Sequence, residues 1–153
     1  MSEPQRSTRR FVVDTNVFVA AIKPFSRDDR ESQLETRTLS LLIELIVNGQ
    51  LELVGNSRLL DEYRRLAEEL SSETSRLILG QLIQKTEVVE VDEEVALRCT
   101  PYLPREETSD LIHAATALQT GAVVITNDRH FDRIGRSGAI QVWNINEAMR
   151  RLL

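Results

Sequence analysis

The sequence predicts a single α/β domain, built on a parallel β-sheet that helices cover on both sides. Short apolar runs rich in β-branched residues alternate with helical segments along the chain, which is the pattern of such a sheet. The length of 153 residues suits one domain with its own hydrophobic core. The composition, 41% hydrophobic and 28% charged, is typical of a folded protein. We expect residues 1–9 to form a polar N-terminal tail and residues 10–153 to form the domain.

Five segments are expected to form the sheet. Residues 11–13, Phe-Val-Val, are a continuous apolar run typical of a strand buried on both faces. The other strands are expected at residues 51–54, 88–91, 122–126 and 140–143.

Helical periodicity predicts the segments between the strands. In residues 57–70, Leu59, Tyr63, Leu66 and Leu70 recur at helical spacing and form one apolar stripe. The other helices are expected at residues 17–22, 39–48, 74–84, 93–98, 109–120 and 146–153, two of them followed by a glycine stop at Gly49 and Gly121. Residues 24–33 are charged and predicted to be a mobile loop, and residues 102–107 a second loop.

Charge and cysteine content narrow the functional classes. The chain has 24 acidic and 19 basic residues, a net charge of -5, which argues against a protein that coats nucleic acid through bulk positive charge. The single cysteine, Cys99, rules out an internal disulfide and a thiolate zinc cluster. No apolar run approaches the length that spans a bilayer, so we expect a cytoplasmic protein with no membrane partner.

Acidic residues follow two of the predicted strands. Asp14 comes directly after the first strand, and Asp128 comes shortly after the fourth. Because the site of a parallel α/β fold lies beyond the carboxyl ends of its strands, we expect both carboxylates to face one crevice. Each aspartate taken alone is equally well interpreted as a helix cap.

Two further acids lie on predicted helices. Glu62 falls about 60° from Leu59, at the margin of the apolar stripe, whereas Asp61 faces solvent. The alternative for Glu62 is a side chain that snorkels at the edge of the core. Asp110 opens the alanine-rich helix, where it also complements the helix dipole.

Four carboxylates with no lysine near any of them suggest a site for hard divalent cations. Mg²⁺ and Mn²⁺ prefer oxygen ligands, and clustered carboxylates without a cation would raise one another's pKa values. One or two bound ions can activate a water molecule and stabilise displacement at a phosphodiester.

The four acidic segments together resemble the PIN-domain family. The resemblance covers about residues 10–144 and rests on Val-Val-Asp14-Thr-Asn, the helix around Glu62, Ser-Asp110-Leu-Ile-His-Ala-Ala-Thr-Ala, and Val-Ile-Thr126-Asn-Asp128. It implies a three-layer α/β/α sandwich and a Mg²⁺- or Mn²⁺-dependent ribonuclease. Many relatives are VapC-like toxins of type II toxin–antitoxin pairs, neutralised by a DNA-binding antitoxin, and a homodimer is a further implication.

The resemblance also assigns roles to residues. Asp14, Glu62, Asp110 and Asp128 occupy the family's acidic positions and would be both catalytic and metal-binding. Supporting roles are implied for Thr126, whose hydroxyl can orient a carboxylate, for Asn16, and for Asp132, which lies near a position that some relatives use as an extra acid.

Histidines and arginines complete the candidates. His113 lies three residues after Asp110 and within reach of the site, although helix packing is the favoured interpretation, and His130 is expected at the surface. Arg129 and Arg133 follow Asp128 and are expected to contact RNA phosphates. Arg64 and Arg65 are assigned to a solvated helix face.

Other functional classes fit less well. A phosphoaspartyl enzyme needs a lysine late in the chain, and there is none after Lys85. A dinucleotide-binding fold lacks its glycine-rich turn after the first strand. A catalytically silent PIN-like module that binds RNA or a protein stays open as the alternative, although the presence of all four acids and Thr126 argues against it.

Overall fold

The centre of the protein is a parallel β-sheet. A computed structural model describes residues 9–22, 29–70 and 72–153 of the chain. Within these residues the sheet has five strands in the order β3-β2-β1-β4-β5, and every neighbouring pair is parallel. The strands are β1 (Arg9–Val13), β2 (Leu51–Gly55), β3 (Thr86–Val88), β4 (Val123–Ile125) and β5 (Gln141–Trp143). Of the predicted tail, only Arg9 lies among the described residues, and it begins β1.

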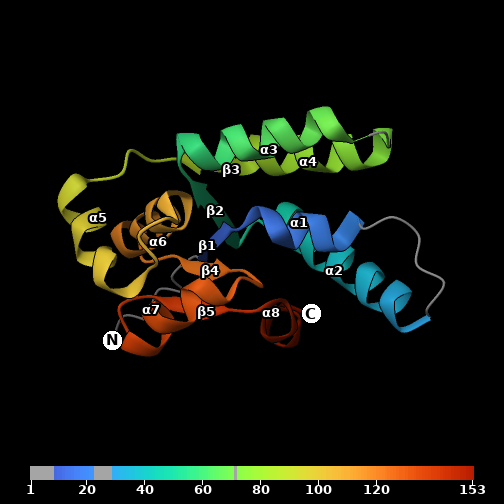
Figure 1. The fold of residues 1–153 in the computed structure, drawn as a ribbon. Helices are drawn as coiled ribbons and strands as arrows, with labels where there is room; N and C mark the ends of the chain where they lie inside the picture. The colour runs from blue at the N-terminus through green and yellow to red at the C-terminus, as the bar shows by residue number, and fades with distance from the viewer. Residues whose placement is uncertain (1–8, 23–28, 71) are drawn as a thin grey trace, which may run out of the picture.

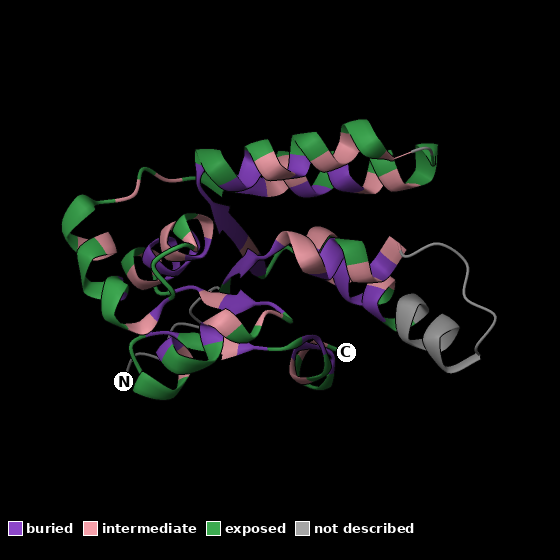
Figure 2. Cartoon of the chain, in the orientation of Figure 1, coloured by how far each residue is buried: buried purple, intermediate pink, exposed green. Residues whose placement is uncertain are grey.

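The middle strand, β1, explains the apolar run at residues 11–13. β1 pairs with β2 on one side and β4 on the other, and Phe11, Val12 and Val13 are all buried. Figure 2 shows this buried centre between the exposed outer faces of the helices. Because Val13 lies opposite Ile125 in the β1–β4 register, the residues that follow the two strands emerge side by side.

Helices cover the sheet on both sides, so the expected three-layer α/β/α arrangement is confirmed. Figure 1 shows α5 and α6 on one side of the sheet and α1 and α2 on the other, and α6 packs against β1, β2 and β4. The helices are α1 (Thr15–Ile22), α2 (Asp29–Val47), α3 (Ser57–Glu69), α4 (Glu73–Lys85), α5 (Glu93–Cys99), α6 (Thr108–Thr120), α7 (Asp132–Ser137) and α8 (Ile145–Leu152), with short 3₁₀ helices η1 (Thr100–Tyr102) and η2 (Arg129–Phe131). In the described parts of the chain no helix combines the length and apolar character needed to cross a membrane.

The alanine-rich helix α6 lies close to the sheet because its inner face is small. Ala114, Ala115 and Ala117 are buried, and short side chains allow the helix and strand backbones to approach. The helix ends where the sequence predicts, at Gly121, whose φ of 74° is the left-handed conformation that glycine adopts without strain. The first turn of α6, with Asp110, is thereby held near the sheet.

The third strand differs from the prediction. It covers Thr86–Val88 rather than residues 88–91, because α4 continues to Lys85 and the buried Thr86 pairs with Leu53. Among the residues that the structure describes, β3 is an edge strand paired with β2 alone, so the apolar pattern of Val88, Val89 and Val91 does not fix where the pairing begins.

Two segments contain more helix than predicted. Of the predicted loop at residues 24–33, residues 24–28 lie outside the described residues, while α2 begins at Asp29. Residues 29–38 have neither glycine nor proline and are largely polar, so they carry no apolar periodicity that would reveal a helix. η2 and α7 were not predicted, because both are shorter than the span over which periodicity is visible.

Candidate active site

The carboxyl ends of β1 and β4 bring Asp14 and Asp128 together through one hydroxyl group. Asp14 is 8% exposed, and its backbone N–H donates to the Ile125 carbonyl at 3.0 Å. The Thr126 hydroxyl donates to Asp14 Oδ2 at 2.8 Å and accepts a hydrogen bond from the Asp128 N–H at 2.9 Å. Asn16 Nδ2 donates to the same carboxylate oxygen at 3.3 Å and to the Thr126 hydroxyl at 3.2 Å. The structure therefore places two of the three residues expected to have a supporting role, Thr126 and Asn16, against Asp14.

Asp110 completes a group of three aspartates. It lies in the first turn of α6 and is 6% exposed. Asp14, Asp110 and Asp128 each offer a carboxylate oxygen, and these atoms lie within 4.8 Å of one another. Asp128 also accepts a hydrogen bond from the His130 N–H at 2.9 Å, so it caps η2 while it faces the other two acids.

Glu62 reaches the site from α3. Its side chain is 23% exposed, and its carboxylate accepts a hydrogen bond from the Thr15 hydroxyl at 3.0 Å. His113 Nε2 lies 3.2 Å from Glu62 Oε2. Asp14, Glu62 and His113 form a second group whose candidate ligand atoms lie within 4.8 Å of one another. The four predicted acids thus make two overlapping groups that share Asp14.

Burial and crowding change the protonation of these acids. Burial raises the pKa of Asp110 to about 6, with a further upward contribution from the charge of Asp128. Burial also raises the pKa of Asp14, although the hydrogen bond from Thr126 offsets part of the effect. Burial alone would raise the pKa of Glu62, but hydrogen bonds from His113, Thr15 and Ser109 outweigh it and the net direction is downward.

This donor set fits a hard divalent cation. The grouped atoms of the three aspartates are all carboxylate oxygens, the ligands that Mg²⁺ and Mn²⁺ prefer. Burial, with a smaller contribution from neighbouring acids, raises the pKa values of Asp14 and Asp110 and so disfavours their ionised forms, which a bound cation would stabilise.

Two histidines belong to the site more closely than the sequence indicates. His130, expected at the surface, is 41% exposed, yet its Nδ1 lies 3.0 Å from Asp110 Oδ2 and 3.1 Å from Asp128 Oδ1. The hydrogen bond with Asp110 raises the pKa of His130. His113 is 1% exposed and packs in the helix layer as expected, but it also contacts Glu62. For His130, the available sequence signal was its place two residues after Asp128, since the short turn η2 that brings it to the acids is not visible in the sequence.

Arginines and one further acid surround the acidic groups. A depression of about 470 Å³ beside Asp128 is lined by Arg129 and Asp132. Asp132 is exposed and, in the part of the chain that the structure describes, belongs to none of the groups that could hold a metal. Arg133 is exposed and does not line this depression.

A second depression, beside Glu62, was not anticipated. It has a volume of about 470 Å³ and is lined by Arg58 and Arg65 together with Ser109. The sequence assigns Arg65 to a solvated helix face and gives no indication of a role for Arg58. Both lie one helical turn from Glu62 on α3, which is the spacing that places side chains on one face.

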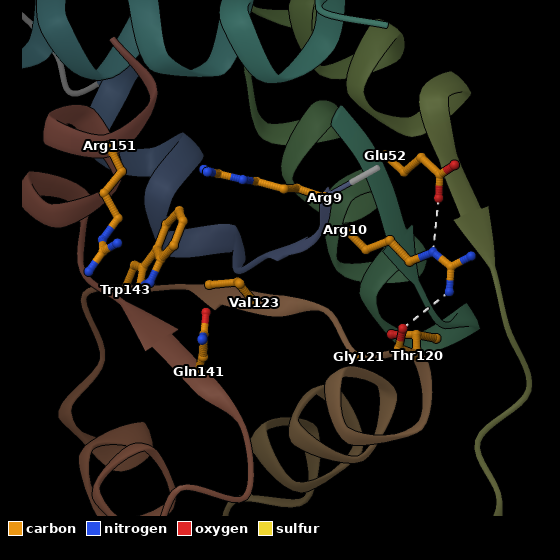
Figure 3. A pocket seen from close by; sticks show the side chains of 9 residues that line it. All are labelled: Arg9, Arg10, Glu52, Thr120, Gly121, Val123, Gln141, Trp143 and Arg151. Atoms are coloured by element: carbon orange, nitrogen blue, oxygen red, sulfur yellow. Dashed lines mark hydrogen bonds and ion pairs between the residues drawn. The ribbon is translucent and has the colours of Figure 1, made fainter. Parts of the chain in front are cut away.

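A larger hollow, of about 690 Å³, lies at the other end of the sheet (Figure 3). Its lining includes the first residues of three strands, Arg9, Val123 and Gln141, and the Trp143 ring that the Arg151 guanidinium covers at 5.0 Å. The acidic groups gather instead where β1 and β4 end, so the largest of these hollows is not the candidate active site.

Comparison with known proteins identifies the family. The PIN-domain model matches residues 11–137, and the chain therefore belongs to the PIN-domain family. No curated protein sequence matches it significantly.

Three solved structures share the fold. VapBC2 from Rickettsia felis, solved bound to a DNA fragment from their promoter, is 19% identical with a TM-score of 0.57, over 88% of this chain and 98% of that one. FitAcB from Neisseria gonorrhoeae is 19% identical with a TM-score of 0.55, over 88% and 97%. FitAB bound to an IR36 DNA fragment is 21% identical with a TM-score of 0.52, over 88% and 94%. At these identities the likeness shows the fold alone.

Proposed function

We propose that this protein is a divalent-metal-dependent endoribonuclease that acts in the cytoplasm. The observation that carries the proposal is the group of Asp14, Asp110 and Asp128, whose carboxylate oxygens lie within 4.8 Å of one another where β1 and β4 end. The chain belongs to the PIN-domain family, whose members are typically nucleases, and this favours phosphodiester hydrolysis among the reactions that such an acidic site could catalyse.

The residues divide into ligands and supports. Asp14, Glu62, Asp110 and Asp128 would hold one or two Mg²⁺ or Mn²⁺ ions. When bound, such a cation lowers the pKa of a water molecule and offsets the negative charge that builds on the phosphate. The hydrogen bonds of Thr126 and Asn16 hold the carboxylate of Asp14 in place, and His130 holds that of Asp110. Asp132 would be an additional acid at the rim of the site.

RNA would approach past arginines that flank the acids on both sides. Arg129 lies beside Asp128, and Arg58 and Arg65 lie beside Glu62. Guanidinium groups bind phosphate oxygens through paired hydrogen bonds, so these positions suit the phosphates on either side of the scissile bond. Arg133 would contact the strand farther from the acids.

The proposal also includes a protein partner. The similar structures are VapBC2 and FitAB assemblies, each with DNA in at least one of the solved forms. We infer by analogy that this chain is the toxin of a type II pair, neutralised by a DNA-binding antitoxin, and that it forms a homodimer. A short DNA-binding protein encoded next to it, whose co-expression abolishes RNA cleavage, is the expected observation.

The decisive experiment compares Asp14→Asn with Asp61→Asn on single-stranded RNA. The unaltered chain should cleave in Mg²⁺ or Mn²⁺ and stop when EDTA is added. Asp14→Asn should fall to background while its circular dichroism is unchanged. Asp61→Asn is the matched control: Asp61 is an exposed acid one residue from Glu62 that lines the same depression as Arg58 and Arg65, but among the described residues it belongs to none of the groups that could hold a metal. Removal of its charge should therefore not lower cleavage. RNA binding without cleavage by the unaltered chain in either metal would favour the silent-module alternative.

A further inference from the structure

A buried chain of polar side chains joins α3 to α6 behind the acidic site. Asn56 is 3% exposed, His113 1% and Thr116 0%. Polar groups this deeply buried are stable only when their hydrogen bonds are satisfied, and no described buried side-chain polar atom lacks a partner. Each donor in this series of hydrogen bonds must therefore face an acceptor, which fixes the direction of each bond.

The amide of Asn56 has only one consistent orientation. Asn56 is the N-cap of α3, and its Oδ1 accepts a hydrogen bond from the Leu59 N–H at 2.8 Å. The opposite orientation would set the amide NH₂ against that N–H donor. Nδ2 is thereby directed at Thr116 Oγ1, at 3.0 Å, and at His113 Nδ1, at 3.1 Å. The Thr116 hydroxyl donates to the Ile112 carbonyl, so it accepts from Asn56.

This orientation fixes the proton of His113. An amide NH₂ group only donates, so Nδ1 must present a lone pair to it. The ring then carries its proton on Nε2, which lies 3.2 Å and 3.3 Å from the two carboxylate oxygens of Glu62. His113 therefore donates to Glu62. The direction of that bond is set by Asn56, because its N-cap hydrogen bond to Leu59 orients the amide that faces His113.

Glu62 needs such a restraint more than the aspartates do. Its side chain has one more rotatable bond than that of aspartate, so without a restraint its carboxylate would sample more rotamers. The Thr15 hydroxyl and His113 Nε2 both donate to Oε2, one from α1 and one from α6. Together they hold the carboxylate facing Asp14.

Distance alone would also allow His113 to be a metal ligand, since it forms a compact group with Asp14 and Glu62. A nitrogen that carries a proton has no lone pair for a cation and cannot accept a proton as a base. Nδ1 does have a lone pair, but it points to Asn56 and away from the acids.

We propose that His113 is a positioning residue that Asn56 holds in the Nε2–H form to orient Glu62, and that it is neither a metal ligand nor a general base. The link to catalysis rests on the proposed nuclease function, whereas the state of the ring does not. The two are tested separately.

The state of the ring is tested in metal-free protein near pH 7.5. The chain has two histidines, so ¹⁵N-histidine labelling gives two ring spectra, which His130→Gln assigns. Long-range ¹H–¹⁵N correlation should show Nε2 protonated and Nδ1 unprotonated in His113. A proton on Nδ1 would overturn the proposal, whether or not the protein cleaves RNA.

The role of the ring is tested with His113→Gln and His113→Leu, matched variants of which only the first keeps an N–H donor near Nε2. We expect His113→Leu to weaken Mn²⁺ affinity and lower kcat by about 10- to 100-fold, the usual effect of losing a group that orients a ligand. His113→Gln should recover most of both losses. If both variants keep the Mn²⁺ affinity and kcat of the unaltered chain, His113 only packs. If both lose them to the same extent, His113 is a metal ligand or a base. Either result overturns the proposal.

Asn56→Ser tests the same series of hydrogen bonds at Asn56, and it keeps the proposal testable if His113→Leu does not fold. Serine is a good N-cap, so α3 keeps its cap while the amide donor to His113 is lost. The His113 ring should then show a mixture of tautomers and Mn²⁺ affinity should fall. A pure Nε2–H ring in folded Asn56→Ser would show that Asn56 does not hold it, contrary to the proposal.

Discussion

A single hydroxyl group, that of Thr126, connects the two acids at the ends of β1 and β4. It donates to Asp14 and accepts from the backbone of Asp128, so its removal affects both acids at once. Valine has the shape of threonine without the hydroxyl, whereas serine keeps the hydroxyl.

We therefore predict that Thr126→Val lowers kcat for RNA cleavage by about 10- to 100-fold in saturating Mn²⁺, because the Asp14 carboxylate loses its donor. Thr126→Ser should retain most of the activity. Steady-state cleavage of one labelled RNA compares the two. Equal activity of Thr126→Val and the unaltered chain would contradict this role.

Asp110 gives the metal-free protein a dependence on pH. Burial raises its pKa from the ordinary value of 3.8 to about 6 in the folded chain, so the folded state binds more protons between these two values. Stability from this group is therefore present at low pH and lost as pH rises through about 6.

Replacing Asp110 by asparagine should remove that loss. We expect Asp110→Asn to be as stable as the unaltered chain near pH 4 and more stable by up to about 3 kcal/mol at pH 7.5 in EDTA, since two pKa units correspond to that free energy. Urea unfolding at both pH values measures the difference. A gain that is the same at both values would show that the ionisation of Asp110 is not its cause.

Single residues also show where sequence reasoning stops. Asp14 and Asp128 could be predicted to lie together because strand ends are visible in the apolar pattern, whereas the prediction for Thr126 rested on the resemblance to the PIN-domain family. The contact of Asn56 with His113 joins residues 57 positions apart through the packing of α3 on α6, and no local pattern encodes it. The place of His130 depends on the 3₁₀ turn η2, which is too short to predict.

At the scale of whole elements, the C-terminal ends of helices were predicted better than the start of the edge strand β3. Gly121 closes α6 at the expected position because a left-handed residue favours glycine. The predicted start of β3 was wrong because the limits of an edge strand are set by its pairing with its neighbour, and Thr86 rather than Val88 is the buried residue. α6 matters most, since it carries both Asp110 and His113.

Two glycine-to-alanine substitutions should change stability in opposite directions. Gly121→Ala places a side chain at a φ of 74° and should cost about 1 kcal/mol. Gly80→Ala lies inside α4, where an added Cβ meets no atom within 4 Å, and should stabilise by about 0.5–1 kcal/mol. Urea midpoints measure both. A stabilising Gly121→Ala would mean that the left-handed cap is not maintained in solution.

At the scale of the whole molecule, the net charge of -5 describes a chain without its proposed cations. Acids that repel one another in the folded state weaken it, and a cation that binds only the folded chain stabilises it by mass action. The unfolded chain no longer brings these acids together.

Mn²⁺ should therefore raise the melting temperature, by the equivalent of about 2.7 kcal/mol at 100 times its Kd. Asp14→Asn should lose most of this increment, because Asp14 belongs to both acidic groups, while Asp61→Asn should keep it. Differential scanning calorimetry with and without EDTA measures the shift. An equal increment in all three chains would place the bound ion elsewhere.

The order of the strands has a consequence for synthesis on the ribosome. β1 is made first but pairs in the centre of the sheet with β4, about 110 residues later, so the Val13–Ile125 pairing must wait for that distant segment. A chain translated only as far as Thr120 contains Asp14, Glu62 and Asp110, but it has neither β4 nor Asp128. The proposed nuclease therefore has no assembled active site on the ribosome until β4 and Asp128 have emerged.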